Sequence, residues 1–316
     1  MQTWTQVYDP LASLAPGFPQ YLLSALVAAI PLFILFYMLA VRRSPGNFAA
    51  LFGTGSAVLL SILVWGMPVG LSLNATLMGA CFGLFPIVWI VITAVWVYNM
   101  TVESGEFEII KTSLANLTND RRLQALFIAF AFGAFIEGTA GFGTPVAITA
   151  AMLVGLGFNP LYAAGICLIA NTAPVAFGAI GVPVVTAAVV AGLDIMHVTK
   201  IVGRQLPFLS IIVPLWLVVT MCGFKRAMEV LPAILVAGFC FAITQYLSSN
   251  FHGPYLPDIL SAFATLIGLI ALLRVWKPKT AWHFPDEAAP IVDVNQKQYT
   301  FGQAMRVTPF HSGIIL

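Results

Sequence analysis

Phe132-Gly133-Ala134-Phe135-Ile136-Glu137-Gly138-Thr139-Ala140-Gly141-Phe142-Gly143-Thr144-Pro145-Val146-Ala147-Ile148 is the stretch on which the fold depends. It contains Glu137, the only charged residue between Leu123 and Leu193. A carboxylate inside a long apolar segment is costly unless it lines a cavity, is paired or is protonated, so by default it marks a functional site. The nearby glycines and proline are poor helix formers. The stretch therefore predicts a helix that stops and restarts beside a polar cavity, because open backbone at membrane depth must be buried in protein or reached by water.

The composition of the chain is that of a membrane protein. Hydrophobic residues make up 60% of the 316 residues and charged residues 8%, whereas soluble domains have roughly 45–50% and 25%. A net charge of +2 gives no reason to expect nucleic-acid binding, and the basic residues at the ends of apolar runs are typical of topology signals. The four cysteines lie in apolar segments without metal-like spacing, and the sequence predicts neither a metal nor a cofactor.

The apolar runs divide the chain into three parts. Residues 1–20 are expected to form a short extracytoplasmic tail, and 21–273 a transmembrane helical domain. Residues 274–316 are expected to form a cytoplasmic loop followed by the start of a further helix, where the chain looks cut short. Arg42-Arg43, directly after the first apolar run, place that end in the cytoplasm by the positive-inside rule.

Two apolar segments, 123–158 and 161–193, are too long for simple spans. As a continuous helix each would measure about 50 Å, against a hydrocarbon thickness of about 30 Å. A helix break is therefore predicted in each segment. In the second segment the break is predicted at Asn171-Thr172-Ala173-Pro174 and at the glycines that follow. Gly143-Thr144-Pro145-Val146 is loosely similar to Gly181-Val182-Pro183-Val184, which hints at two related elements.

The remaining spans complete an all-α, polytopic integral membrane protein with broken or re-entrant helices. Leu206 to Gly223 is predicted to be one span, and Ser248 to Asp258 a loop between two later spans. The sequence leaves open which of the two broken segments is re-entrant.

The run Gly133 to Thr149 resembles the bacterial L-lactate permease family, and the resemblance continues through Leu153–Phe158, Leu161–Gly165, Asn171–Ala179 and Val202–Phe208. It implies a multi-pass protein of the bacterial inner (plasma) membrane that imports L-lactate, or related 2-hydroxy monocarboxylates such as glycolate, with a proton. Family members have a second membrane half. Thr139 and Thr144 stand where alanine is common, and back-bonding of their hydroxyls to the helix is the favoured reading.

A carrier for a small carboxylate needs an anion site, and broken helices supply backbone N–H groups at their N-termini. Glu137 is the candidate for proton coupling. The candidate substrate-binding residues are Gly138, Gly141, Gly143, Thr144, Asn171, Thr172, Gly181 and Arg204. Three alternatives stay open: the glycines are packing contacts, Glu137 bonds amides of its own broken helix, and Arg204 is an anchor at the membrane edge.

Other functions compete with this one. A related carrier could transport another organic anion with H⁺ or Na⁺, and a truncated fragment would transport nothing. A membrane enzyme would need a cluster of His, Asp, Glu or Cys side chains near one face. The apolar region is expected to offer only Glu137. An enzyme is therefore not predicted. The oligomeric state is open.

Overall fold

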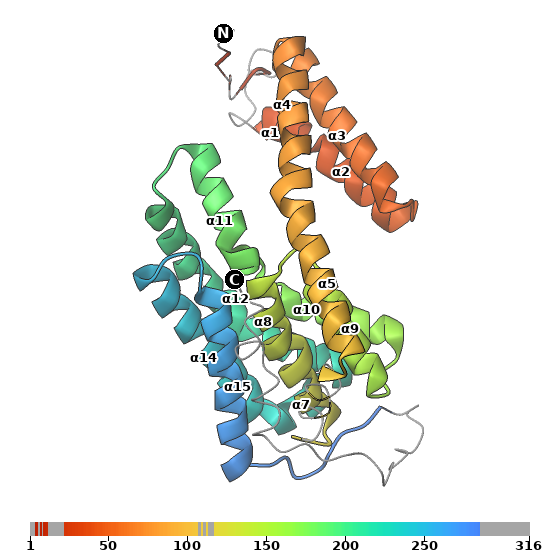
Figure 1. Ribbon diagram of the computed structural model, residues 1–316, viewed down its shortest axis with the longest axis vertical. Helices are drawn as coiled ribbons and strands as arrows, with labels where there is room; N and C mark the ends of the chain where they lie inside the picture. Colours follow the sequence, from red (N-terminus) through yellow and green to blue (C-terminus); the bar gives the residue numbers. More distant parts are fainter. Residues whose placement is uncertain are drawn as a thin grey trace. The chain divides into compact units, whose positions relative to one another are not determined.

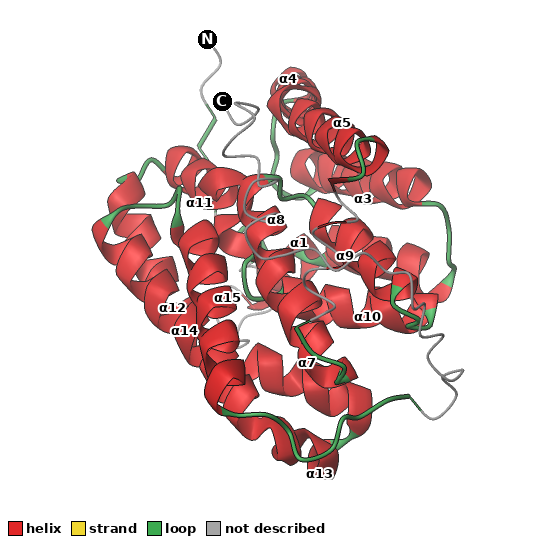
Figure 2. Ribbon diagram, turned by 60° about the horizontal axis from the view of Figure 1, so that its bottom comes forward, coloured by secondary structure: helices red, strands yellow, loops and turns green. Residues whose placement is uncertain are grey.

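The computed structural model describes residues 4–5, 7, 9–11, 22–106, 109, 112 and 117–284. Within these residues the regular elements are all helical (Figure 2), which confirms the predicted all-α class. The chain forms two compact units, Met1–Trp89 and Ile90–Leu316. Most of the predicted tail, and all of 285–316 with its predicted further helix, lie outside the described residues.

The first unit consists of short and bent helices. They are α1 (Leu22–Ala28), α2 (Ile30–Phe36), η2 (Tyr37–Val41), α3 (Gly46–Leu63), α4 (Val69–Phe82) and η3 (Gly83–Val88). The first span bends by 40° between α1 and the helix that follows it, because Pro31 lacks the N–H that would continue the ladder. Phe85 leaves the helical region, with φ −143° and ψ 115°, since a residue before proline disfavours the helical conformation.

The second unit carries the predicted breaks. After α5 (Trp89–Glu103), its elements are α7 (Arg121–Ala125), η4 (Leu126–Phe132), α8 (Gly133–Thr139), α9 (Thr144–Gly155), α10 (Pro160–Asn171), η5 (Val175–Phe177), α11 (Gly178–Ala191), α12 (Ile195–Cys222), α13 (Phe224–Ala227), η6 (Met228–Val230), α14 (Leu231–Phe251) and α15 (Pro257–Val275). Among the described residues of the whole chain, five helices are long and apolar enough to cross a membrane, and two bent pairs raise the number to seven. The chain is a polytopic membrane protein.

Helices α9 and α10 form a short hairpin. Each has 12 residues and is about 18 Å long, which is little more than half of the hydrocarbon thickness. The two helices pack on each other, and the Asn159 side chain caps α10 by accepting from the Leu161 and Tyr162 amides. This hairpin lies between the two predicted breaks, and neither of its helices alone has the length of a full span.

Helices α12, α14 and α15 lie side by side, with α14 in the middle (Figure 1). The predicted start of a span at Leu206 is wrong, because α12 begins at Ile195. Asp194 is its N-cap and accepts from the His197 amide at 2.8 Å. Lys200 and Arg204 therefore belong to the helix itself and not to a flanking loop.

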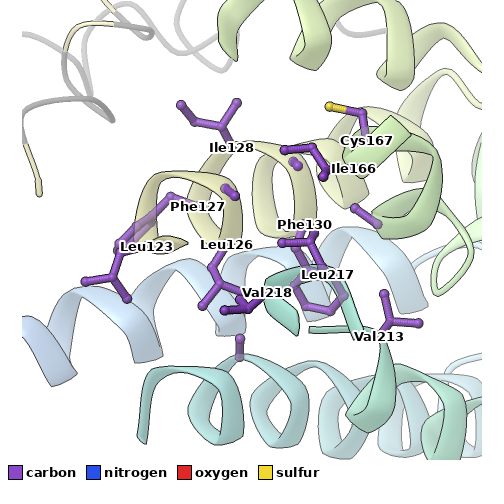
Figure 3. Close-up of a cluster of buried hydrophobic side chains, with 14 of the residues drawn as sticks. Leu123, Leu126, Phe127, Ile128, Phe130, Ile166, Cys167, Val213, Leu217 and Val218 are labelled. Carbon is purple, nitrogen blue, oxygen red and sulfur yellow. The ribbon is translucent and has the colours of Figure 1, made fainter. Parts of the chain in front are cut away.

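The segment from α7 to α8 is the centre of the core. Figure 3 shows Leu123, Leu126 and Phe130 pointing into a cluster with side chains of α10 and α12, among them Ile166, Leu217 and Val218. In contrast, Phe208, Ile212 and Trp216 form an exposed apolar stripe along α12. Such a stripe fits contact with lipid.

Arg122 ties the start of α7 to two distant parts of the chain. Its side chain is fully buried and pairs with Asp120 at 2.7 Å and Glu229 at 2.9 Å. It also donates to the carbonyls of Arg226 and Thr280. Arg122 is one of the basic residues at the ends of apolar runs that are typical of topology signals, and the structure gives it a further role as the centre of a buried ion-pair network.

Candidate functional site

The first break follows α8 where the sequence predicts it. The last helical amide is that of Ala140, which donates to the Ile136 carbonyl at 2.8 Å. Gly141, Phe142 and Gly143 then adopt φ values of 63°, 53° and 79°. Three successive left-handed residues reverse the winding of the chain, and this costs energy at a non-glycine residue such as Phe142. The predicted stop and restart is confirmed.

The second break has the same conformation. Ala179, Ile180 and Gly181 adopt φ values of 47°, 56° and 76°, so α11 becomes regular only after Gly181. In both breaks glycine is the last left-handed residue and a proline stands two positions later. The weak likeness in sequence therefore has a structural counterpart. Strained backbone of this kind is concentrated at functional sites.

The two breaks touch each other. A methyl group added to Gly141 would place its carbon 2.7 Å from the Ala179 Cβ and 2.8 Å from the Ala179 amide nitrogen. Another added to Gly181 would overlap the Pro254 carbonyl, and one added to Gly138 would lie 3.0 Å from the Asp258 Cβ. Close packing therefore requires these three glycines, which agrees with the alternative that they are packing contacts. Their part in substrate binding stays a prediction.

Glu137 lies at this junction. Its side chain is only 3% exposed and lies beside the Asn171 side chain at the end of α10. A methyl group on Gly178 would overlap the carboxylate, with its carbon 3.1 Å from Glu137 Cδ. Because the polar neighbour of Glu137 is Asn171 of α10, the contacts among the described residues do not support the alternative in which this acid bonds the amides of its own helix. Glu137 Oε2 and Asn171 Oδ1 have no hydrogen-bond partner.

A second buried acid, Asp258, lies in the first turn of α15 and is 1% exposed. The loop predicted from Ser248 to Asp258 exists but is shorter, since α14 continues to Phe251 and α15 begins at Pro257. The expectation that Glu137 is the only acid in the apolar region is therefore wrong. Pro-Asp directly before an apolar run is typical of a helix start, and this signal could have placed Asp258 in the first turn of a helix.

Asp258 belongs to a chain of polar side chains. Gln245 Nε2 of α14 donates to Asp258 Oδ1 and to the Ala173 carbonyl in the second break, each at 3.4 Å. Gln245 Oε1 accepts from Ser210 Oγ of α12 at 2.9 Å. Asp258 Oδ2 has no partner. Gln245 thus connects the second acid to the second break.

The other candidate residues have different surroundings. Thr144 is buried at the start of α9, and an added methyl on Gly143 would meet open space. Thr172 is exposed and its hydroxyl donates to the Ile169 carbonyl. The Thr139 hydroxyl donates to the carbonyls of Phe135 and Ile136, which is the predicted back-bonding to its own helix.

Arg204 does not join the buried acids. It is exposed, and its Nε donates to Asn250 Oδ1 at 3.2 Å. Among the described residues no ion pair involves Glu137 or Asp258, and no group of three or more His, Cys, Asp or Glu side chains could hold a metal ion. Within the described part of the chain, the junction therefore combines two carboxyl groups, the side-chain amides of Asn171 and Gln245 and strained backbone, without a permanent cation.

A family model described as L-lactate permease matches residues 24–314. The chain belongs to the L-lactate permease family. It is 54% identical over 284 residues to the L-lactate permease of Bacillus subtilis strain 168, covering 90% of this chain and 49% of that relative. It is 49% identical over 322 residues to glycolate permease GlcA of Escherichia coli K12, covering 98% of this chain and 56% of that relative.

The L-lactate permease of Escherichia coli K12 is 47% identical over 313 residues, with 98% of this chain and 56% of that relative covered. The chain spans about half the length of these curated relatives. No solved structure matches it. Membership of the L-lactate permease family and the apolar helices identify a multi-pass protein of the bacterial plasma membrane, and the family is one of transporters rather than enzymes.

Proposed function

We propose that this L-lactate permease homologue acts in secondary active transport and imports L-lactate, and related 2-hydroxy monocarboxylates such as glycolate, together with protons. The names of the relatives support the substrate class, since they include both lactate and glycolate permeases. The observation that carries the proposal is the junction of two broken helices beside a buried acid, seen at Gly141, Ala179 and Glu137.

The anion site of the proposal lies at the restart of two helices. Helix α9 begins at Thr144 and the regular part of α11 at Val182. The first amides of a helix have no carbonyl partner within it, and together with the helix dipole they attract a carboxylate. Such a site holds an anion without a fixed counter-charge and therefore releases it readily.

Side chains around the junction match the rest of the substrate. Thr144 offers a hydroxyl and Asn171 an amide whose Oδ1 has no partner. An acceptor of this kind can bind the 2-hydroxyl group of lactate or glycolate. A substrate without that hydroxyl would leave a buried donor or acceptor unpaired, at a free-energy cost of about 1–3 kcal/mol. Thr144 and Asn171 would therefore favour 2-hydroxy acids over simple carboxylates.

Glu137 is the proposed coupling residue. An acid at membrane depth next to an anion site suits proton transfer, because binding a negative substrate and binding a proton favour each other electrostatically. The proposal makes Asn171 the link between the acid and the substrate, and the proximity of Asn171 to Glu137 supports it.

Uptake measurements test this proposal. The chain is reconstituted in proteoliposomes, alone and joined to the remaining half of the Bacillus subtilis relative, because it spans about half of that protein. We expect saturable uptake of L-lactate and glycolate, but not of succinate, driven by an imposed proton gradient. In the Glu137→Gln variant, lactate should no longer drive proton uptake. Uptake that needs a sodium gradient, or an unchanged ratio of protons to lactate in the variant, would contradict the proposal.

A further inference from the structure

Glu137 and Asp258 face one region from two neighbouring helices. Helices α8 and α15 pack against each other, and the contact is so close at Gly138 that an added methyl would lie 3.0 Å from Asp258 Cβ. Glu137 directly precedes Gly138 in α8, so both acids belong to this helix contact. Each is almost fully buried and each has one oxygen, Glu137 Oε2 and Asp258 Oδ2, without a partner.

The elements packed on α8 offer no counter-charge. Helices α9 and α11 and the segment η4 contain no titratable residue. Helix α10 contributes two titratable groups, and neither carries a positive charge. The Cys167 thiol lies beside Thr149 of α9, and the Tyr162 hydroxyl donates to the Thr220 carbonyl. Apart from Asp258, therefore, no charged side chain faces Glu137 from these elements.

The elements packed on α15 offer none either. Helix α14 has two titratable groups, Cys240 and Tyr246. The Cys240 sulfur lies against Gly268, which is about three helical turns from Asp258 along α15. Tyr246 is exposed. The nearby cation, Arg204, is exposed and bonds Asn250. Two buried carboxylates without a cation repel each other, and both lose their hydration.

The geometry points to a buried acid pair, Glu137 and Asp258, that keeps at least one proton at the junction of the two breaks. Its second acid, Asp258, extends the proposed coupling site from one residue to two. The role of the pair in transport rests on the proposed function, whereas proton retention by the pair does not.

Gln245 gives the second acid an effect on the second break. Its Nε2 is shared between Asp258 Oδ1 and the Ala173 carbonyl. An ionised Asp258 attracts this donor more strongly than a neutral one, since charge-assisted hydrogen bonds are the stronger kind. Loss of the proton from Asp258 would therefore draw Gln245 away from the break, so Gln245 is a positioning residue.

Infrared difference spectroscopy on the reconstituted chain tests the pair without requiring transport. A protonated carboxylic acid has a carbonyl stretch that is separate from the amide and carboxylate bands. We expect this band in the unmodified chain at neutral pH. Asp258→Asn and Glu137→Gln should each abolish or shift it, and Gln245→Leu should shift it by removing the donor to Asp258.

Asp194→Asn is the matched control, because it removes an exposed carboxylate at the start of α12 and should leave the band unchanged. Asparagine and glutamine keep the size of the acids, and size-exclusion chromatography identifies variants that fail to fold. The proposal is overturned if folded Asp258→Asn has the same band as the unmodified chain. It is also overturned if no band exists at neutral pH and sodium alters the carboxylate bands, which would show an ionised pair that binds a cation. If the band behaves as expected but lactate is not taken up, the pair stands and the proposed function fails.

Discussion

Gly141 and Ala179 hold the two helix breaks in direct contact, with room for no additional carbon between them: a Cβ on Gly141 would lie 2.7 Å from that of Ala179. Both residues have left-handed backbone conformations. The contact joins the chain before the short hairpin of α9 and α10 to the chain after it. At this contact the junction therefore requires a glycine at position 141.

Gly141→Ala should destabilise the second unit by about 1–3 kcal/mol or more, because the methyl group both overpacks the contact and disfavours the left-handed conformation. Gly165→Ala is the control, since Gly165 lies within α10 and nothing lies within 4 Å of its added carbon. Thermal unfolding in detergent compares the two. Equal unfolding temperatures would show that the breaks do not touch.

Gly178→Ala should displace the Glu137 carboxylate, which the new methyl group would overlap. The backbone at this position has φ −62° and accepts alanine, so the protein should fold. Because the acid is displaced from Asn171, we expect lactate binding to weaken by roughly tenfold, equivalent to about 1.4 kcal/mol. Titration calorimetry measures it.

The shorter acid provides the internal check. In Gly178→Ala combined with Glu137→Asp, the carboxylate withdraws from the methyl group, and part of the lost affinity should return. Additive losses in the double variant would instead show that residues 137 and 178 act independently.

Arg122→Met should lower the free energy of unfolding by about 3–5 kcal/mol, because it leaves buried Asp120 without its cation. Arg226→Gln is the comparison, since the Arg226 side chain is exposed and only its carbonyl contacts Arg122. Thermal unfolding should separate the two variants clearly. A similar small effect from both would mean that the network contributes little.

Gly268→Ala should weaken the packing of α14 on α15, because the added carbon would lie 2.7 Å from the Cys240 sulfur. Cys240→Ala in the same protein removes that sulfur and should restore much of the lost stability, since the Cys240 Cβ is 3.6 Å away. The unfolding temperatures of the two single variants and the double variant form a mutant cycle. A double variant no more stable than Gly268→Ala would place the conflict elsewhere.

Local signals were enough to locate the breaks. Glycine and proline act on the backbone of their own few residues, so the sequence around Gly143 and Pro145 was sufficient to predict where α8 ends and α9 begins. The membrane class and the importance of Glu137 were equally readable, because an acid inside a long apolar run is visible in the sequence itself and by default marks a functional site.

Asp258 could not be paired with Glu137 in this way. The two acids are far apart in the chain, and only the packing of α15 on α8 brings them together. The role of Gln245 likewise depends on α14 lying between α12 and α15. From its amino-acid sequence alone, this protein is a polytopic membrane protein with two interrupted helices and one conspicuous acid. That the interruptions meet, and that a second acid packs beside them with no cation among the described residues, was decided by tertiary packing, because close contacts between distant helices leave no trace in the local pattern of either.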